Sequence, residues 1–236
     1  MNRLTWFFIF IVIVLLYLII SYTNNKNKNI VTISIPKVEQ KCKYIDINNL
    51  SVIESTIKFK VHTIPYVLTR KQCENIRNDA LLYLKPSKVY NVPDKYQDLI
   101  RSSTSCTILN EDTLLIQSIA SKLSGYPIDN IEPVQIVRYE EGQGFSEHYD
   151  TDKDSISSTR VATFMIYLNE GFIGGETEFT QIKKLITPEI GMGVFWWNTS
   201  GGELIQESKH KGRYIISGTK WIINTWVHSI AINEIK

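Results

Sequence analysis

Short runs of β-branched and aromatic residues fill the second half of the chain, and they constrain the fold more than any other feature. The runs are separated by Gly, Pro, Asn or Asp, which are typical of turns. The predicted strands cover residues 134–139, 160–168, 193–197, 214–217 and 221–228. Many short strands in succession are typical of an antiparallel sandwich or barrel.

Two helices are predicted before these strands. Thr69 and Gln72 have the spacing of a capping box, in which each side chain accepts a hydrogen bond from the other residue's backbone N–H, and the helix should run to about Leu84. A second helix fits residues 111–124, with Gly125 as its C-terminal stop. Helices followed by a series of strands indicate an α+β domain.

The N-terminal end carries a long apolar run at residues 4–22 that contains no charge. A helix of this length spans about 28 Å, close to the hydrocarbon thickness of a bilayer. A cleaved signal peptide is the alternative, but its apolar region is usually shorter and ends in small residues. We predict a short tail at 1–3, a single-pass transmembrane signal anchor at 4–22, a polar tether at 23–58 and a folded domain at 59–236.

Composition excludes several classes of protein. A hydrophobic content of 43% is that of a globular body, and a net charge of +2 with scattered lysines predicts no nucleic-acid partner. The cysteines, Cys42, Cys73 and Cys106, have no CxxC spacing and predict neither a disulfide framework nor a zinc site. One pair could still bridge in an oxidising compartment. The sequence selects neither a pair nor an oligomeric state.

Two histidines and one aspartate are candidates for a metal site. His148 and Asp150 lie two residues apart, so on an extended strand both side chains would point to one face. His210 follows much later and precedes an aromatic strand. Two histidines and a carboxylate form the facial triad that binds non-haem Fe(II) and leaves coordination positions open. The alternatives are surface histidines, hydrogen-bonded core histidines and a zinc hydrolase site.

Lys220, ten residues after His210, distinguishes an Fe(II) oxygenase site from a zinc hydrolase site. A zinc hydrolase needs a metal, a water and a general base, but no buried lysine. An Fe(II) oxygenase that uses 2-oxoglutarate needs a fixed cation for the second carboxylate of that co-substrate, and a buried ammonium needs such a partner. The alternative is a lysine whose ammonium reaches solvent.

The stretch from about His62 to His228 resembles the prolyl 4-hydroxylase family of Fe(II)- and 2-oxoglutarate-dependent dioxygenases. The motifs that carry the resemblance are, in order, HTIPYVLTRKQCENI, RSSTSCTIL, VRYEEGQGFSEHYD, RVATFMIYLNEGFIGGETEF, the turn at 188–191 with GVFWW, and HKGRYIISGTKWIINTWVH. Together they cover nearly the whole predicted domain. The family implies a double-stranded β-helix, or jelly-roll, core with flanking N-terminal helices.

The resemblance also implies roles for particular side chains. The residues that would bind Fe(II) are His148, Asp150 and His210. The residues that would bind 2-oxoglutarate are Lys220, Tyr139 and Thr177. The residues that would line the peptide groove are Arg160, Trp226 and His228. For the aromatic residues in these sets, ordinary strand packing is the alternative.

The activity that the resemblance implies is hydroxylation of peptidyl proline to 4-hydroxyproline, with Fe(II), 2-oxoglutarate, O2 and L-ascorbate, and with release of succinate and CO2. Related oxygenases that act on lysine or on nucleobases generally have arginine at the position of Lys220, so the lysine favours the proline branch. The alternatives are the same chemistry on another target and a non-enzymatic, membrane-tethered binding module. Tyr214 and Ile215 stand where the family commonly has Pro-Val, which leaves the peptide sequence open.

Membrane-anchored relatives usually place the catalytic domain in the lumen of the endoplasmic reticulum, and we predict this orientation. The lysines that follow the apolar run favour a cytosolic domain by the positive-inside rule, so that orientation stays open as the alternative. Asn49 and Asn198 begin glycosylation sequons, which matter only for a lumenal domain.

Overall fold

The computed structural model describes residues 45, 47–54, 58–89, 93, 96–151 and 160–235. The apolar run predicted to be a membrane anchor, most of the predicted tether and Cys42 lie outside these residues. Within the described part of the chain, no helix is long and apolar enough to cross a membrane. Cys73 and Cys106 are both free thiols.

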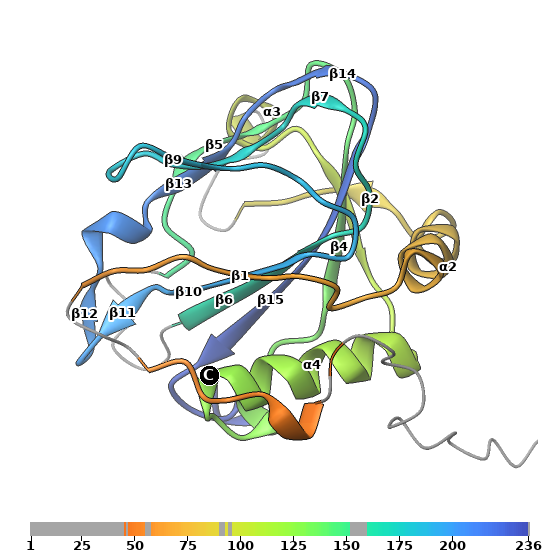
Figure 1. Ribbon diagram of the computed structural model, residues 1–236. Coiled ribbons are helices and arrows are strands. Elements are labelled where there is room, and N and C mark those ends of the chain that lie inside the picture. The colour runs from red at the N-terminus through yellow and green to blue at the C-terminus, as the bar shows by residue number, and fades with distance from the viewer. Residues whose placement is uncertain are drawn as a thin grey trace, which may run out of the picture. The chain divides into compact units, whose positions relative to one another are not determined.

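Two antiparallel sheets face each other and form the body of the domain (Figure 1). The major sheet has the order β1 (His62–Ile64), β10 (Gly193–Trp197), β6 (Arg160–Tyr167), β15 (Lys220–His228), β4 (Gln135–Tyr139), β3 (Thr104–Thr107) and β2 (Lys85–Pro86). The minor sheet has the order β5 (Phe145–His148), β13 (His210–Gly212), β8 (Thr177–Phe179) and β9 (Lys184–Ile186). Two short ribbons pair β7 (Ile173–Gly174) with β14 (Ile215–Ser217), and β11 (Thr199–Ser200) with β12 (Glu203–Leu204).

Each strand predicted from the sequence is present, with ends that differ by no more than one residue. The strands of the minor sheet are only three or four residues long and carry charged residues. Such segments have no clear alternation of apolar and polar residues, so the pattern does not predict them.

The first predicted helix begins as expected but ends early. In α2 (Arg70–Ala80), the Gln72 backbone N–H donates to Thr69 Oγ1 at 3.2 Å, and the Thr69 N–H donates to Gln72 Oε1 at 3.0 Å. The capping box is therefore confirmed. The predicted end near residue 84 is wrong: Leu82 and Tyr83 are 86% and 58% exposed, so a longer helix would bury little there. A short helix, α3 (Gln97–Ile100), was not predicted.

The second predicted helix is confirmed over its full length as α4 (Glu111–Ser124). Gly125 ends it with φ of 74°, a left-handed conformation that glycine adopts at little cost. The helix covers the face of the major sheet that points away from the minor sheet (Figure 1). The α+β prediction is thus confirmed, with three layers: minor sheet, major sheet and helix.

The central strands are buried on both faces, and alternate residues pack into different cores. On β6, Phe164 and Ile166 pack with the helices, whereas Met165 and Tyr167 pack with the minor sheet. The same alternation on β15 places Ile222 between the two sheets. Lys220, two residues before Ile222 on the same strand, therefore also faces the inter-sheet layer.

The two predicted glycosylation sequons differ in access. Asn198 is 0% exposed, and its amide Nδ2 donates hydrogen bonds to Arg160 O and Thr163 Oγ1. A folded domain cannot present this amide to a glycosyltransferase. Asn49, in the exposed 3-10 turn Ile47–Asn49, has no such burial.

If the protein is expressed in a eukaryotic secretory pathway and carries an N-glycan, we expect the glycan at Asn49 and not at Asn198. Ser51→Ala and Ser200→Ala each remove one sequon and leave its asparagine in place. Only Ser51→Ala should abolish a glycosidase-sensitive shift on a gel. A shift that disappears with Ser200→Ala would contradict the burial of Asn198.

Candidate metal centre and co-substrate site

The three predicted metal ligands converge at one edge of the inter-sheet layer. His148 is the last residue of β5 and His210 is the first residue of β13, and the two are direct partners in the antiparallel pair. Asp150 lies in the bend after β5. The expectation that strand alternation places His148 and Asp150 is therefore wrong, because the strand ends at His148 and the bend turns the carboxylate toward both rings.

The ligand atoms lie close enough to share one ion. One atom from each of the three residues lies within 4.8 Å of the others. His148 Nε2 is 3.6 Å from Asp150 Oδ1, and His210 Nε2 is 3.7 Å from Asp150 Oδ2. These separations are too long for hydrogen bonds, but they suit donors arranged around a cation.

Backbone carbonyls determine which ring nitrogen of each histidine is free. His148 Nδ1 lies 2.7 Å from Ser146 O, and His210 Nδ1 lies 2.9 Å from Ser208 O. A carbonyl oxygen only accepts, so each Nδ1 must carry the proton. Each Nε2 then presents a lone pair to the centre, which is the outer-shell arrangement typical of metal-binding histidines. The donor set fits Fe(II).

The electrostatics of the centre favour the same protonation states. Burial and the nearby His148 lower the pKa of His210 to about 4, so its ring is neutral at physiological pH. Burial alone would raise the pKa of Asp150, but the two histidines and a hydrogen bond from Thr163 hold it well below its usual range. The neutral His210 imidazole and the Asp150 carboxylate therefore face the centre without a hydrogen-bonded proton between them.

Aromatic side chains enclose the two histidines. The ring of Phe145 stacks on His148 at 3.6 Å between centroids. Trp196 and Phe179 contact His210 at 5.0 and 5.6 Å between centroids. These rings limit access of water to the centre, and a low local dielectric strengthens the interaction of a bound ion with its ligands.

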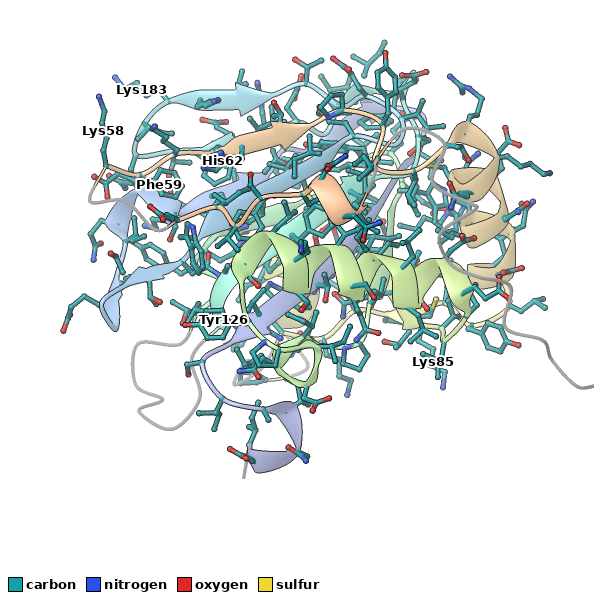
Figure 2. All side chains as sticks on the ribbon, turned by 60° about the horizontal axis from the view of Figure 1, so that its bottom comes forward. Lys58, Phe59, His62, Lys85, Tyr126 and Lys183 are labelled. Carbon is teal, nitrogen blue, oxygen red and sulfur yellow. The ribbon has the colours of Figure 1, made fainter. Side chains whose placement is uncertain are left out.

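Lys220 lies in the same inter-sheet layer and is only 2% exposed. By contrast, Lys58, Lys85 and Lys183 project outward from the ribbon (Figure 2). Lys220 Nζ donates to Gly175 O at 2.6 Å. Burial lowers its pKa to about 7, although the negative charge of nearby Glu176 opposes the shift. The alternative of a solvent-exposed ammonium is wrong, because this amine is buried and a bound anion would stabilise its charged form.

The other two residues predicted to bind 2-oxoglutarate lie beside Lys220. Tyr139 is its direct partner in the β15–β4 pair, with the ring centroid 5.5 Å from Nζ. Tyr167, which the sequence did not indicate, lies at the same distance and donates its hydroxyl to Thr177 Oγ1 at 2.8 Å. Thr177 is 3% exposed and faces the same layer.

Asn169 holds the backbone on both sides of Lys220. Its Nδ2 donates to Thr219 O, and the Trp221 backbone N–H donates to its Oδ1, both at 2.7 Å. This bidentate contact extends the β6–β15 pairing by side-chain atoms at the start of β15. An asparagine after a strand gives no sequence signal of such a role, because asparagine is equally typical of turns.

The three residues predicted to line a peptide groove form one cluster. The guanidinium of Arg160 lies 3.9 Å from the ring centroid of Trp226, a cation–π contact. Arg160 Nε and Nη2 donate to the two carboxylate oxygens of Glu132 at 2.6 and 3.0 Å, and His228 Nε2 also contacts Glu132. The sequence did not indicate Glu132, which joins side chains from two strands.

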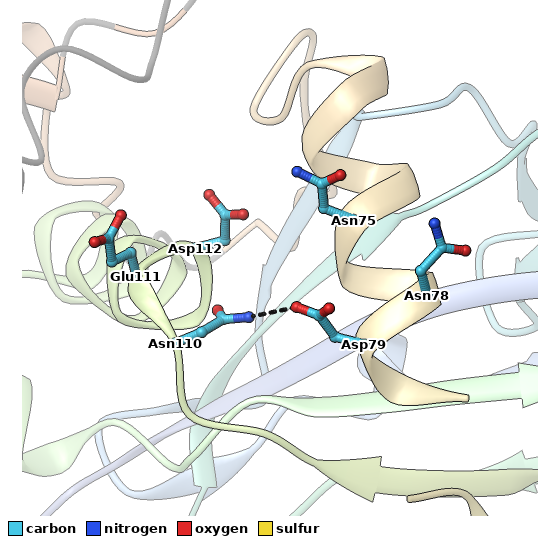
Figure 3. Close-up of a pocket in the computed structure, with 6 residues that line it drawn as sticks. All are labelled: Asn75, Asn78, Asp79, Asn110, Glu111 and Asp112. Atoms are coloured by element: carbon cyan, nitrogen blue, oxygen red, sulfur yellow. Dashed lines mark hydrogen bonds between the residues drawn. The ribbon is translucent and has the colours of Figure 1, made fainter. Parts of the chain in front are cut away.

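A separate hollow of about 540 Å³ lies between α2 and the start of α4, and no ligand of the triad lines it (Figure 3). Its lining residues are Asn75, Asn78, Asp79, Asn110, Glu111 and Asp112. Several of these groups already serve the helices, since Asn110 caps α4 and donates to Asp79 at 3.3 Å.

Comparison with known proteins agrees with this site. The family model described as the 2OG-Fe(II) oxygenase superfamily matches residues 134–228, which contain all nine predicted site residues. A viral collagen prolyl hydroxylase from Paramecium Bursaria Chlorella virus-1, solved with 2OG, has a TM-score of 0.57 and 28% identity. The match covers 72% of this chain and 96% of that one. A Pseudomonas putida prolyl-4-hydroxylase shares the fold, with a TM-score of 0.52 at 17% identity.

Curated relatives match at similar identity. A putative prolyl 4-hydroxylase of Acanthamoeba polyphaga mimivirus is 29% identical over 180 residues, which cover 69% of this chain and 73% of that protein. The human prolyl 4-hydroxylase subunit alpha-1 is 28% identical over 115 residues, 45% of this chain. That match spans only 22% of the length of the human subunit.

The fold and the triad together define a 2OG-Fe(II) dioxygenase with a jelly-roll core, and residues 134–228 match the 2OG-Fe(II) oxygenase superfamily. Within that superfamily its sequence is prolyl 4-hydroxylase-like, at moderate identity.

His210→Ala should weaken binding of Co(II), a spectroscopic substitute for Fe(II), by more than about 100-fold, because loss of a direct ligand costs more than loss of an outer-shell partner. Absorption titration of the full chain measures the dissociation constant. His62→Ala, a histidine on β1 outside the cluster, is the control and should bind Co(II) as the unmodified chain does. Equal affinities for the two variants would contradict the assigned centre.

Proposed function

We propose that the chain hydroxylates proline residues of a peptide or protein to 4-hydroxyproline, using Fe(II), 2-oxoglutarate and O2, with L-ascorbate keeping the iron reduced. The observation that carries this proposal is the pairing of a two-histidine, one-carboxylate centre with a buried lysine in the same layer between the sheets. The choice of proline is supported by the names of the relatives, which are prolyl hydroxylases.

In this proposal His148, Asp150 and His210 bind the iron. When bound, Fe(II) and 2-oxoglutarate supply the oxidising chemistry, in which one oxygen atom of O2 enters the substrate and the other enters succinate as CO2 leaves. The chain itself contributes ligands, orientation and exclusion of water, and none of its side chains acts as a nucleophile.

Lys220 would neutralise the distal carboxylate of 2-oxoglutarate, and Thr177 and Tyr139 would complete that end of the pocket. Tyr167 already donates to Thr177 Oγ1, so the Thr177 hydroxyl hydrogen is free for another acceptor. Its acceptor in the structure is the weak Met165 sulfur at 3.8 Å, and a carboxylate oxygen is a far stronger one.

Arg160, Trp226 and His228 would contact the peptide. Glu132 neutralises Arg160 and orients it over the Trp226 ring. Trp226 and His228 are only 6% and 7% exposed, so the partly exposed Arg160 side chain is the part of this cluster that a peptide would meet first. Proline rings pack well on aromatic faces, and extended proline-rich peptides lose little entropy on binding. The same chemistry on another residue is the alternative, which product analysis distinguishes.

The full chain, supplied with Fe(II), ascorbate and 2-oxoglutarate, should release succinate faster when proline-rich or collagen-like peptides are added. Mass spectrometry should place one added oxygen on proline. Succinate release that peptides do not stimulate would support the oxygenase activity but contradict the proposed substrate. Oxygen added to another residue would show that the target is not proline. No succinate from folded, metal-loaded protein would favour a binding module instead.

Binding of 2-oxoglutarate should take up a proton at alkaline pH. With a pKa of about 7, Lys220 is mostly neutral at pH 8 in the free protein, and a bound carboxylate favours the ammonium. Calorimetry in buffers of different ionisation enthalpy should therefore give an uptake of about one proton at pH 8 and almost none at pH 6.

Lys220→Met should lose both the proton uptake and most of the affinity for 2-oxoglutarate. Lys211→Met, which removes a partly exposed lysine paired with Glu178, is the matched control and should change neither. Proton uptake that persists in Lys220→Met would assign the titration to another group.

A further inference from the structure

Asp150 is held by a chain of hydrogen bonds that begins deep in the major sheet. Thr163 Oγ1 donates to Asp150 Oδ2 at 2.7 Å, and Asn198 Nδ2 donates to Thr163 Oγ1 at 2.9 Å. Thr163 lies on β6 and is 1% exposed, while Asn198 follows β10 and is 0% exposed. Neither residue belongs to the metal ligands, the co-substrate pocket or the peptide cluster.

The donor and acceptor roles in this series of hydrogen bonds follow from the second contact of Asn198, which is with Arg160 O. Its Nδ2 also lies 3.2 Å from Arg160 O, and a backbone carbonyl can only accept. The amide nitrogen must therefore be on that side, and its two hydrogens serve Arg160 O and Thr163 Oγ1. Because the Thr163 hydroxyl accepts from Asn198, its own single hydrogen is directed to Asp150.

Strand pairing holds Thr163 and Asn198 in place. Trp196 is the direct partner of Thr163 in the β10–β6 pair, and the Asn198 backbone N–H donates to Val161 O at 2.8 Å. Asp150, in contrast, lies in a bend beyond the end of β5. The series of hydrogen bonds therefore connects a ligand in a bend to paired, buried strands of the major sheet.

We propose that Thr163 and Asn198 are positioning residues of the metal centre, which fix the rotation of the Asp150 carboxylate so that it faces both histidine Nε2 atoms. The inference rests on the proposed metal centre. Since Asn198 also holds the carbonyl of Arg160, it couples the metal ligand to the first residue of the strand that begins at the peptide cluster.

A purely structural role is the competing explanation, because buried hydrogen bonds also stabilise the fold. The two roles differ in what a substitution changes. Loss of a structural hydrogen bond lowers the free energy of unfolding. Loss of a positioning hydrogen bond also changes the affinity and geometry of the metal.

The test measures Co(II) affinity and absorption spectrum of the full chain, together with its unfolding midpoint. Thr163→Val, which keeps the shape of the side chain, should weaken Co(II) binding by about 10- to 100-fold and alter the ligand-field bands. Thr163→Ser keeps the hydroxyl and should restore most of the affinity. The matched control is Thr225→Val, since Thr225 is equally buried on the neighbouring strand but donates to Glu132 O. It should lose stability and keep the Co(II) affinity.

Asn198→Asp tests the direction of the hydrogen bonds from Asn198 through Thr163 to Asp150. A carboxylate at this position cannot donate, so the Thr163 hydroxyl should turn toward it and leave Asp150. This variant should lose Co(II) affinity as Thr163→Val does, and the double variant should lose little more, because both remove the same hydrogen bond.

The outcomes separate this inference from the proposed function. Native Co(II) affinity and spectrum in Thr163→Val, with binding lost in His210→Ala, would overturn the positioning role and keep the metal centre. Additive losses in the double variant would also overturn it. Native affinity in both Thr163→Val and His210→Ala would overturn the centre itself.

Discussion

Burial of β6 and β15 on both faces determines where the chemistry of this domain can lie. These strands pack one face against helix α4 and the other against the minor sheet, so a polar side chain on either strand must find a partner or bind a ligand. Thr163 meets this condition through Asp150 and Asn198. Lys220 meets it only in part, because its ammonium donates to one backbone carbonyl. Burial with so few partners lowers the pKa of this amine.

The metal centre and Lys220 are complementary, because the centre favours a cation and the lysine favours an anionic partner. Asp150 brings a buried negative charge with two imidazole lone pairs beside it, which favours a cation. Lys220 brings a buried amine that favours an anion. A co-substrate that chelates a metal at one end and carries a carboxylate at the other satisfies both sites at once, whereas a simple metal-bound water would satisfy only the first.

Local sequence patterns predicted much of this arrangement, and the reasons for the failures are physical. The capping box at Thr69, the full length of α4 and the long strands follow from short-range signals, and each is present. The minor sheet depends on pairing between segments far apart in the chain, which no local pattern encodes. The predicted end of α2 was wrong because helix propensity continues past Ala80, whereas the side chains after Ala80 have no core to pack against.

The same distinction applies to the site. Histidine, aspartate and lysine at the right spacing carry a signal because few other roles require them together. Glu132, Asn169 and Asn198 have ordinary residue types, and their roles arise only when strand pairing brings them to a partner. Asn198 illustrates the point, since the sequence marks it only as the first residue of a glycosylation sequon, whereas its side chain lies wholly inside the domain.

The direct pairing of His148 with His210 has a consequence for the stability of the smaller sheet. Strands β5 and β13 are short, and they are joined at the point where the ion would bind. The free energy of metal binding is therefore shared with the strand pair: an ion present at 100 times its dissociation constant adds about 2.7 kcal/mol to the state that binds it. This is a large fraction of what a domain of ordinary stability has in reserve. An ion bound here would thus act as a removable cross-link between two segments of the chain, and its removal would weaken the β5–β13 pair.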